Sequence, residues 1–291
     1  MRTPEQMYHT ILQFARDRAD IRAVYLNGSR ANPNAPQDDF MDYDVVYVTD
    51  KIAAYRGDTS WIADLGQIAV MQQPDDPAIF PDGHDPDRRY AFLMQFRDGV
   101  RIDLTLLAPS LVKSHYTADK IVRPLLDKDG ILPPPAPATD RDYWVKPPTA
   151  AGYCGCCNEF WWVSTYVAKG LWRGELLYAI DQLNLGVRPM LLRMLCWWVG
   201  QRTGFKASMG KCCKYLPANL PSAWQKLLAG TYPPLDEEAI WQALFNAAEL
   251  FSQAAAAVAA AQGFSYDNCQ QQGALGYLHG VQNGAFGTRR Q

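Results

Sequence analysis

Glycine, serine and aspartate residues near the amino terminus have the spacing of a site that binds phosphate and a divalent cation. Gly28 and Ser29 follow the apolar segment 21–26, which is typical of a strand that ends in a turn. Asp42 and Asp44 come next, and because side chains alternate across a strand, both carboxylates point to one face. Two such carboxylates can share Mg²⁺, and a Gly-Ser turn can bind phosphate oxygens. The pattern indicates a site for a nucleoside triphosphate.

A third carboxylate, Asp103, lies in the apolar segment 100–107 and shares one strand face with Arg101 and Thr105. Burying an unpaired charge is unfavourable, so Asp103 needs a reason to be there. We expect it to complete the metal site or to take a proton from an acceptor hydroxyl, although a salt bridge would also explain it. Arg30, directly after the Gly-Ser turn, is either a triphosphate contact or a surface arginine.

A second group of polar and aromatic side chains lies on one face of a helix predicted over residues 158–171. That face carries Glu159, Trp162, Tyr166 and Lys169, and the opposite face is apolar. The stripe suits a pocket in which Glu159 binds an amine or guanidinium and Lys169 binds phosphate; packing between domains is the alternative. Asp181 is either a second acid of this cleft or an exposed helix carboxylate.

The segments that position these residues alternate between helix and strand up to about residue 130. We expect a helix over 5–18, strands over 21–26, 43–49 and 68–72, and a hairpin of 90–96 with 100–107 around an Asp-Gly turn. Proline-rich segments then give way to helices, one starting at Pro189 and one running from Asp236 to Gly263. The predicted domains are a sheet domain over 1–135, a connector over 136–149 and a helical domain over 150–291.

Composition excludes several other classes of protein. A net charge of -2 does not suggest a nucleic-acid-binding protein. The most apolar run, 254–261, is too short to span a membrane, and the amino terminus lacks the apolar core of a signal peptide. Seven cysteines, an odd number, argue against a disulfide framework in a cytosolic protein. We expect a cytoplasmic monomer with no nucleic-acid or membrane partner.

The motifs resemble those of the aminoglycoside 6-adenylyltransferase family, the streptomycin-modifying nucleotidyltransferases, over most of the chain. The segments that carry the resemblance are 26–33, 42–44, 101–106, 125–130, 157–162, 166–170 and 188–194. The first three are shared by many nucleotidyltransferases, and the later ones are specific to this family. The cysteine-rich segments around residues 154–157 and 212–213, and the Gln/Gly-rich tail, depart from the family pattern.

The resemblance implies an α+β protein: an amino-terminal, polymerase-beta-like mixed sheet domain and a carboxy-terminal helical bundle, with the site between them. It implies transfer of AMP from Mg·ATP to the 6-hydroxyl of streptomycin, with release of pyrophosphate. Gly28, Ser29 and Arg30, together with Lys169, would bind the nucleotide phosphates. Asp42, Asp44 and Asp103 would bind Mg²⁺, with Asp103 as ligand or general base. Glu159, Trp162, Tyr166 and Asp181 would bind the acceptor.

Two alternatives stay open on the sequence. The same chemistry would serve another aminoglycoside or a protein hydroxyl as acceptor, although transferases that modify proteins are usually shorter. A nucleotidyltransferase-like domain that binds nucleotide without turnover is the other alternative, and an intact set of Asp42, Asp44 and Asp103 argues against it. Preference for ATP over GTP and the number of metal ions are left open.

Overall fold

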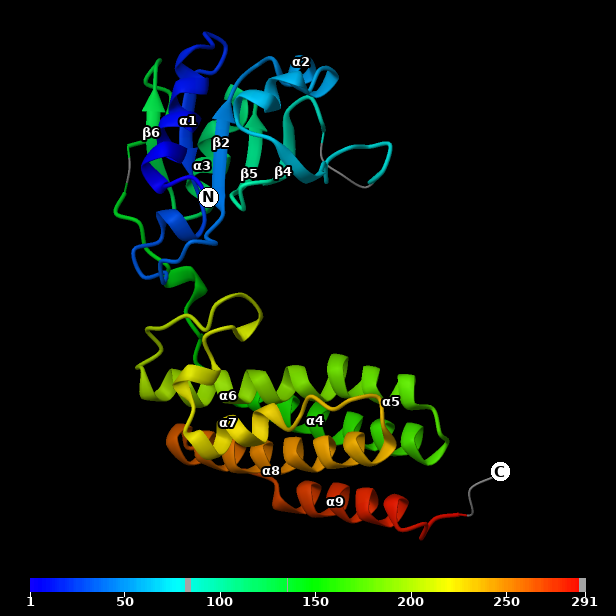
Figure 1. Ribbon diagram of the computed structural model, residues 1–291. Helices are drawn as coiled ribbons and strands as arrows, with labels where there is room; N and C mark the ends of the chain where they lie inside the picture. The colour runs from blue at the N-terminus through cyan, green and yellow to red at the C-terminus, as the bar shows by residue number, and fades with distance from the viewer. Residues whose placement is uncertain (82–84, 135, 288–291) are drawn as a thin grey trace. The chain divides into compact units, whose positions relative to one another are not determined.

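The computed structural model describes residues 1–81, 85–134 and 136–287 and divides the chain into two compact units (Figure 1). Unit 1 is Met1–Asp142 and contains a mixed sheet, and unit 2 is Tyr143–Gln291 and is helical. The α+β fold class predicted from the sequence is therefore confirmed. The boundary falls inside the predicted connector. Pro135 and residues 288–291, which the predicted domains include, lie outside the described residues.

A six-stranded sheet forms the centre of unit 1, in the order β3-β4-β5-β2-β1-β6. The strands are β1 Ala23–Leu26, β2 Tyr43–Val48, β3 Ile68–Gln72, β4 Arg89–Phe96, β5 Arg101–Leu107 and β6 Arg123–Asp127. β2 and β5 pair in parallel, and the other neighbours pair antiparallel. This arrangement places two strands that are distant in sequence side by side at the centre of the sheet.

The two faces of the sheet are covered unequally. The helices of unit 1 are α1 Pro4–Arg16, α2 Ile52–Gly57 and α3 Val112–Ala118. On one face, Met7, Ile11 and Phe14 of α1 pack with strand residues such as Val45 and Leu104 in the larger core of the unit. On the other face, a smaller core joins α3 to a few strand residues, which are Ala23, Tyr25, Val46, Val48 and Leu107. The strand alternation places Asp44 and Asp103 on this second face, beyond the part that α3 covers.

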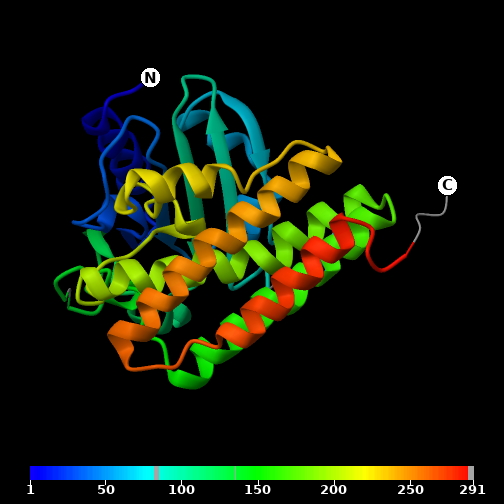
Figure 2. The same ribbon diagram turned by 90° about the horizontal axis from the view of Figure 1, so that it is seen from below.

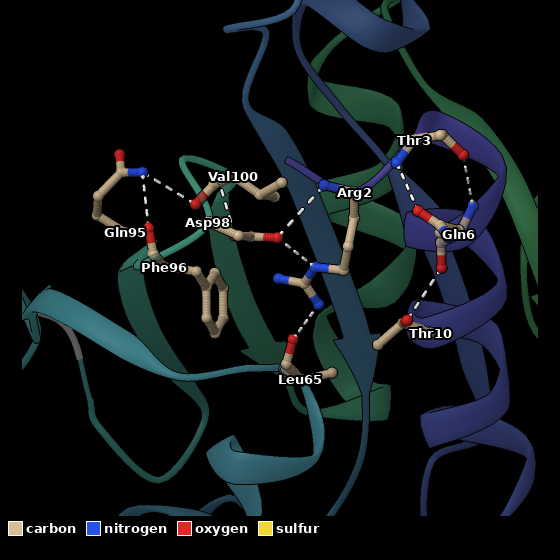
Figure 3. A network of polar contacts seen from close by, with 9 residues as sticks. All are labelled: Arg2, Thr3, Gln6, Thr10, Leu65, Gln95, Phe96, Asp98 and Val100. Atoms are coloured by element: carbon tan, nitrogen blue, oxygen red, sulfur yellow. Dashed lines mark hydrogen bonds and ion pairs between the residues drawn. The ribbon is translucent and has the colours of Figure 1, made fainter.

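The amino terminus is fixed to the turn between β4 and β5 (Figure 3). The Arg2 guanidinium donates to Asp98 Oδ2 at 2.7 Å and to the Leu65 carbonyl, and it lies 5.2 Å from the centroid of the Phe96 ring. Thr3 then begins α1 with a capping box that it forms with Gln6. These contacts hold the β4–β5 turn, and Arg101 begins β5 directly after that turn.

Unit 2 is a bundle of helices around a core rich in aromatic residues. Its helices are α4 Ala150–Trp172, α5 Leu176–Gln182, α6 Arg188–Arg202, α7 Ser222–Ala229, α8 Glu237–Gln262 and α9 Asn268–Gln282. Phe160 of α4 stacks on Phe251 of α8 with ring centroids 3.8 Å apart. α9, red in Figure 2, packs along α4. The Asp236 cap and the left-handed Gly263 bound α8 as the sequence predicts.

The predicted helix start at Pro189 is only partly right, because the helical path begins earlier. A π-helix, Leu183–Val187, joins α5 to α6 without a break. Pro189 has no N–H to donate to the carbonyl four residues before it, and a wider turn at this point accommodates that loss. Gly186 lies in the same turn, where a side-chain Cβ would come within 2.5 Å of Val163 Cγ1. At Gly186 the π-helix therefore comes close to α4.

α8 bears on the prediction that no segment spans a membrane. Among the described residues, α8 is long and apolar enough to cross a membrane by length and composition alone. The uninterrupted apolar run 254–261, on which the prediction rests, is only the last part of this helix. Over half of the qualifying window is buried within the structure, including Leu244, Phe251 and Val258, which are fully buried. α8 is therefore a core helix of unit 2, a kind of helix that passes the same test.

Candidate active site

The three predicted catalytic carboxylates gather at the centre of the sheet in unit 1. Asp44 is the second residue of β2 and lies directly opposite Asp103 of β5 in the parallel register. Asp42 immediately precedes β2, two residues before Asp44. The sequence predicted that these acids meet, and the parallel pairing of β2 with β5 is the feature that brings them together.

Gly28 packs directly against the Asp44 carboxylate. Its φ of +67° is in the left-handed region, and a Cβ at this position would lie 2.0 Å from Asp44 Oδ2. The backbone N–H of the preceding residue, Asn27, donates to the Asp44 carbonyl at 3.0 Å. Only glycine allows the turn to come this close. The predicted phosphate turn, Gly28–Ser29, is thus adjacent to the predicted metal ligand.

Burial and repulsion from neighbouring carboxylates disfavour the charged forms of Asp44 and Asp42. The pKa of Asp44 is raised to about 6, first by burial and then by repulsion from Asp103 and Asp42. Burial also raises the pKa of Asp42, and Asp103 adds to the effect, while Arg101 opposes it. Two neighbouring carboxylates with raised pKa values form a site whose charged state a bound cation would stabilise.

Arg101 provides part of that positive charge. Its Nε and Nη2 atoms donate to the two oxygens of Asp103 at 2.8 and 2.9 Å, and its Nε lies 3.6 Å from Asp42 Oδ2. Within the described ranges, no three His, Cys, Asp or Glu side chains are arranged so that they could hold a metal ion. The donor set still suits Mg²⁺, which prefers carboxylate oxygens. The side-chain Oδ1 of Asn27 adds a buried oxygen with no hydrogen-bond partner in the described structure.

Arg30 is held beside the same acids. Its guanidinium lies 3.7 Å from the centroid of the Tyr43 ring and donates to the Met41 carbonyl at 2.8 Å. Tyr43 is the residue between Asp42 and Asp44 in the sequence. Its positive charge lowers the pKa of Asp42, against the larger effect of burial. Its Nε is buried and has no partner among the described residues. Arg30 therefore combines a fixed ring stack with an unused donor.

The predicted stripe on α4 of unit 2 forms a connected surface. Trp162, which is 58% exposed, donates from its indole N–H to the Tyr166 hydroxyl at 2.8 Å. The Lys169 ammonium lies 5.5 Å from the centroid of the Tyr166 ring. Glu159 and Lys169 are exposed, whereas the opposite face of α4 is buried in the core. The stripe thus presents an acid, a cation and the Trp162 ring away from the core of its own unit, while Tyr166 is half-buried against that core.

Asp181 is an exposed residue near the end of α5. The predicted site residues therefore fall into two groups: residues 28–30, 42, 44 and 103 in unit 1, and residues 159, 162, 166, 169 and 181 in unit 2. Each group is formed within its own unit. A site that joins the two groups stays a prediction.

Comparison with known proteins assigns the family. The family model described as streptomycin adenylyltransferase matches residues 1–281. The chain belongs to the streptomycin adenylyltransferase family. Aminoglycoside 6-adenylyltransferase from Campylobacter jejuni is 39% identical over 268 residues, which are 91% of each chain. Aminoglycoside 6-adenylyltransferase from Bacillus subtilis (strain 168) is 37% identical over 97% of this chain and 98% of that protein.

A crystal structure of an aminoglycoside 6-adenyltransferase from Bacillus subtilis is 33% identical and covers 97% of this chain and 99% of that chain, with a TM-score of 0.47. That likeness is too loose to carry an argument, and the fold class follows from the strands and helices described above. The predictions of the family and of a nucleotidyltransferase enzyme are confirmed by the sequence matches.

Two residues of this streptomycin adenylyltransferase-family site were not recognised as functional candidates from the sequence. Arg101 was noted only as sharing a strand face with Asp103, and Asn27 only as part of a motif. The signal for Arg101 was present, because an arginine two residues before an acid on one strand has the reach to bind it. The buried, unpartnered Oδ1 of Asn27 is visible only in the structure.

Proposed function

We propose that this protein transfers AMP from Mg·ATP to the 6-hydroxyl of streptomycin, releases pyrophosphate and thereby inactivates the antibiotic. The observation that carries the proposal is the pairing of Asp44 with Asp103 beside Gly28, in a chain of the streptomycin adenylyltransferase family. The relatives that match over most of the chain are named aminoglycoside 6-adenylyltransferases. The carboxylates and the glycine turn supply the two kinds of group that this chemistry needs.

The reaction is a displacement at the α-phosphorus. The acceptor hydroxyl oxygen forms a bond to that phosphorus, the bond to the pyrophosphate oxygen breaks, and the hydroxyl proton passes to Asp103 as general base. Asp42, Asp44 and Asp103 would hold Mg²⁺, which neutralises the charge of the triphosphate when bound. No covalent enzyme intermediate is required.

The phosphate groups have several partners in this proposal. The Gly28–Ser29 turn, in which Gly28 touches Asp44, offers backbone N–H groups and the Ser29 hydroxyl. Arg30 contributes its unpartnered Nε, and Lys169 contributes an exposed ammonium from unit 2. The three carboxylates of Asp42, Asp44 and Asp103 outnumber the cationic side chains beside them. They would repel a bare triphosphate, so the nucleotide would bind together with its metal ion.

Streptomycin carries guanidinium groups, and the acids of unit 2 match that charge. Glu159 and Asp181 are exposed carboxylates that can each accept hydrogen bonds from a guanidinium. Trp162 and Tyr166 offer ring faces on which a cationic sugar derivative can pack. Their hydrogen bond fixes the two rings relative to each other, which reduces the entropy lost on binding.

The test is pyrophosphate release from Mg·ATP by the purified protein, with streptomycin, spectinomycin and kanamycin as separate acceptors. We expect release with streptomycin only, and its loss in Asp103→Asn. Asp64→Asn is the matched control, because Asp64 is an exposed acid of unit 1 whose partner is Arg18. Activity of the control at the wild-type level would show that loss of charge alone is not the cause.

Other outcomes would redirect the proposal. Release with kanamycin or spectinomycin instead would assign another aminoglycoside acceptor. Binding of Mg·ATP without release with any acceptor would favour a protein hydroxyl as acceptor or a nucleotide-binding role without turnover. Repeating the assay with GTP determines the preferred nucleotide. We expect the enzyme to act as a cytoplasmic monomer, which light scattering and cell fractionation test.

A further inference from the structure

Arg101 has a contact pattern that the proposed chemistry does not yet use. Both of its hydrogen bonds to Asp103 are short, at 2.8 and 2.9 Å, and they form a two-pronged pair. The same guanidinium reaches Asp42 at 3.6 Å. One cation thus contacts two of the three carboxylates that would hold Mg²⁺, at the position where the metal would neutralise them.

This pairing limits what Asp103 can do. Each of its oxygens already accepts a hydrogen bond from the Arg101 guanidinium, so Arg101 competes with a metal ion or an incoming proton for this carboxylate. Asp103 therefore cannot serve fully as ligand or base while Arg101 is bound to it. Arg101 also neutralises only part of the negative charge of the site, because it offers one positive charge to three carboxylates.

The other side of Arg101 faces a pocket into which it can move. The pocket has a volume of about 280 Å³, and its charged lining residues are Arg2, Arg30 and Arg101 together with Asp38 and Asp39. It also includes Met41 and Tyr43, the residues on either side of Asp42, so it lies next to the acids. The Arg101 side chain is 42% exposed, which leaves it free to change rotamer. Arg2 is already bound to Asp98, so Arg30 and Arg101 are the cations of this pocket that could turn to the phosphate groups of a nucleotide.

We propose that Arg101 is an internal counter-ion that holds Asp103 and Asp42 in the metal-free enzyme and is displaced from them when metal and nucleotide bind. The proposal rests on the magnesium site of the proposed function. Arg101 is a positioning residue, because it acts through Asp103. It keeps the acids together before the metal arrives and then turns to the phosphates, so that Asp103 becomes available only when the substrate is present.

The test measures metal binding without turnover. Mn²⁺, which replaces Mg²⁺ and is visible by electron paramagnetic resonance, is titrated into the full-length protein in the absence of nucleotide. Arg101→Gln should bind Mn²⁺ roughly tenfold more tightly than wild type or better, because a competing cation has been removed. Arg97→Gln is the matched control, since it removes the same charge from the exposed turn of the same hairpin. It should bind Mn²⁺ as wild type does.

A second measurement keeps the proposal testable if Arg101→Gln fails to fold. In wild-type protein labelled with ¹⁵N, the Arg101 Nε–H signal, assigned by its loss in Arg101→Lys, should shift when Mg²⁺ and a non-hydrolysable ATP analogue are added. An unchanged signal would mean that Arg101 stays on Asp103, and would overturn the proposal. Equal or weaker Mn²⁺ binding by a folded Arg101→Gln protein would also overturn it.

The failure of this proposal can be told apart from failure of the proposed function. Pyrophosphate release with streptomycin by the wild-type enzyme, together with unchanged Mn²⁺ affinity in Arg101→Gln, would remove the counter-ion role alone. Absence of Mn²⁺ binding by wild type and variant would overturn the counter-ion role and the metal site together. Arg101→Lys keeps the charge and loses the two-pronged geometry, so its Mn²⁺ affinity should fall between those of wild type and Arg101→Gln.

Discussion

Replacing Asp44 by asparagine should stabilise the metal-free protein even though it removes a residue that the proposed reaction requires. The pKa of Asp44 in the folded protein is about 6, against an ordinary value of 3.8. At about 1.4 kcal/mol for each pKa unit, the folded state loses about 3 kcal/mol when this carboxyl is ionised at neutral pH. An asparagine side chain carries no charge at any of these pH values, so the variant would not lose this free energy.

The sign and the pH range follow from the direction of the shift. Below about pH 4 the carboxyl is protonated in both the folded and unfolded states, so Asp44 has no effect on stability. Between about pH 4 and pH 6 the unfolded state releases the proton first, and the free energy of unfolding of the wild-type protein falls as pH rises. Above about pH 6 the loss is constant. The stability advantage of Asp44→Asn should therefore be full at pH 7.5 and should shrink towards pH 4.5.

The measurement is urea denaturation in EDTA, followed by circular dichroism, at both pH values. Asp64→Asn is the control, because Asp64 is 60% exposed in its ion pair with Arg18 and should change the free energy of unfolding by less than about 1 kcal/mol. Added Mg²⁺ should stabilise wild type more than Asp44→Asn. A variant that is no more stable than wild type at pH 7.5, or an advantage that does not depend on pH, would refute the reasoning.

Two further substitutions test the phosphate turn and the acceptor stripe. Gly28→Ala should destabilise the protein by more than the roughly 1–3 kcal/mol expected for alanine at φ +67° and ψ −154°, because its Cβ would also clash with Asp44. Gly130→Ala has nearly the same φ of +65° with open space around it, so thermal unfolding of the two variants separates clash from strain; equal losses would contradict the close packing. Glu159→Gln should raise KM for streptomycin roughly tenfold and leave KM for ATP unchanged, because it removes the charge of one hydrogen-bonding partner. Steady-state kinetics beside Glu238→Gln, an exposed acid on α8, checks this, and a parallel rise in both variants would point to general electrostatics instead.

The sequence predicts the central strands and helices of this protein well where local patterns are strong. β3 has the predicted bounds, and α8 has the predicted cap and end, because alternation and capping residues are local signals. β6 was missed because Pro124 lies within it. An edge strand tolerates that proline, since one side of its backbone has no neighbouring strand to bond with.

α9 was missed for a different reason. Its sequence contains Gly273, Gly276 and Gly280, which have low helix propensity, and it has little apolar periodicity. The helix is capped by the Asp267 side chain, and Leu278 and Val281 bury themselves in the core of unit 2. Packing against α4 therefore outweighs the weak helix propensity of this segment. The free energy of that packing depends on the tertiary structure and cannot be inferred from local sequence.

The candidate site shows the same division between local and tertiary information. Asp-x-Asp after a Gly-Ser turn is a local pattern, and the acids of unit 1 lie where it predicts them. The register that places Asp44 opposite Asp103 depends on a parallel pairing between strands more than fifty residues apart. The contact of Arg101 with Asp42 depends on that register and could not be derived from spacing, whereas its pair with Asp103 lies within one strand.

The contact between Gly28 and Asp44 joins the two parts of the proposed nucleotide site into one rigid unit. The turn that would bind phosphate touches the carboxylate that would bind the metal, and the Asn27 N–H ties the same turn to the backbone of β2. A displacement of either part therefore moves the other. Because metal and phosphate must be held in fixed relation for an in-line displacement, this packing meets a requirement of the chemistry that neither motif meets alone.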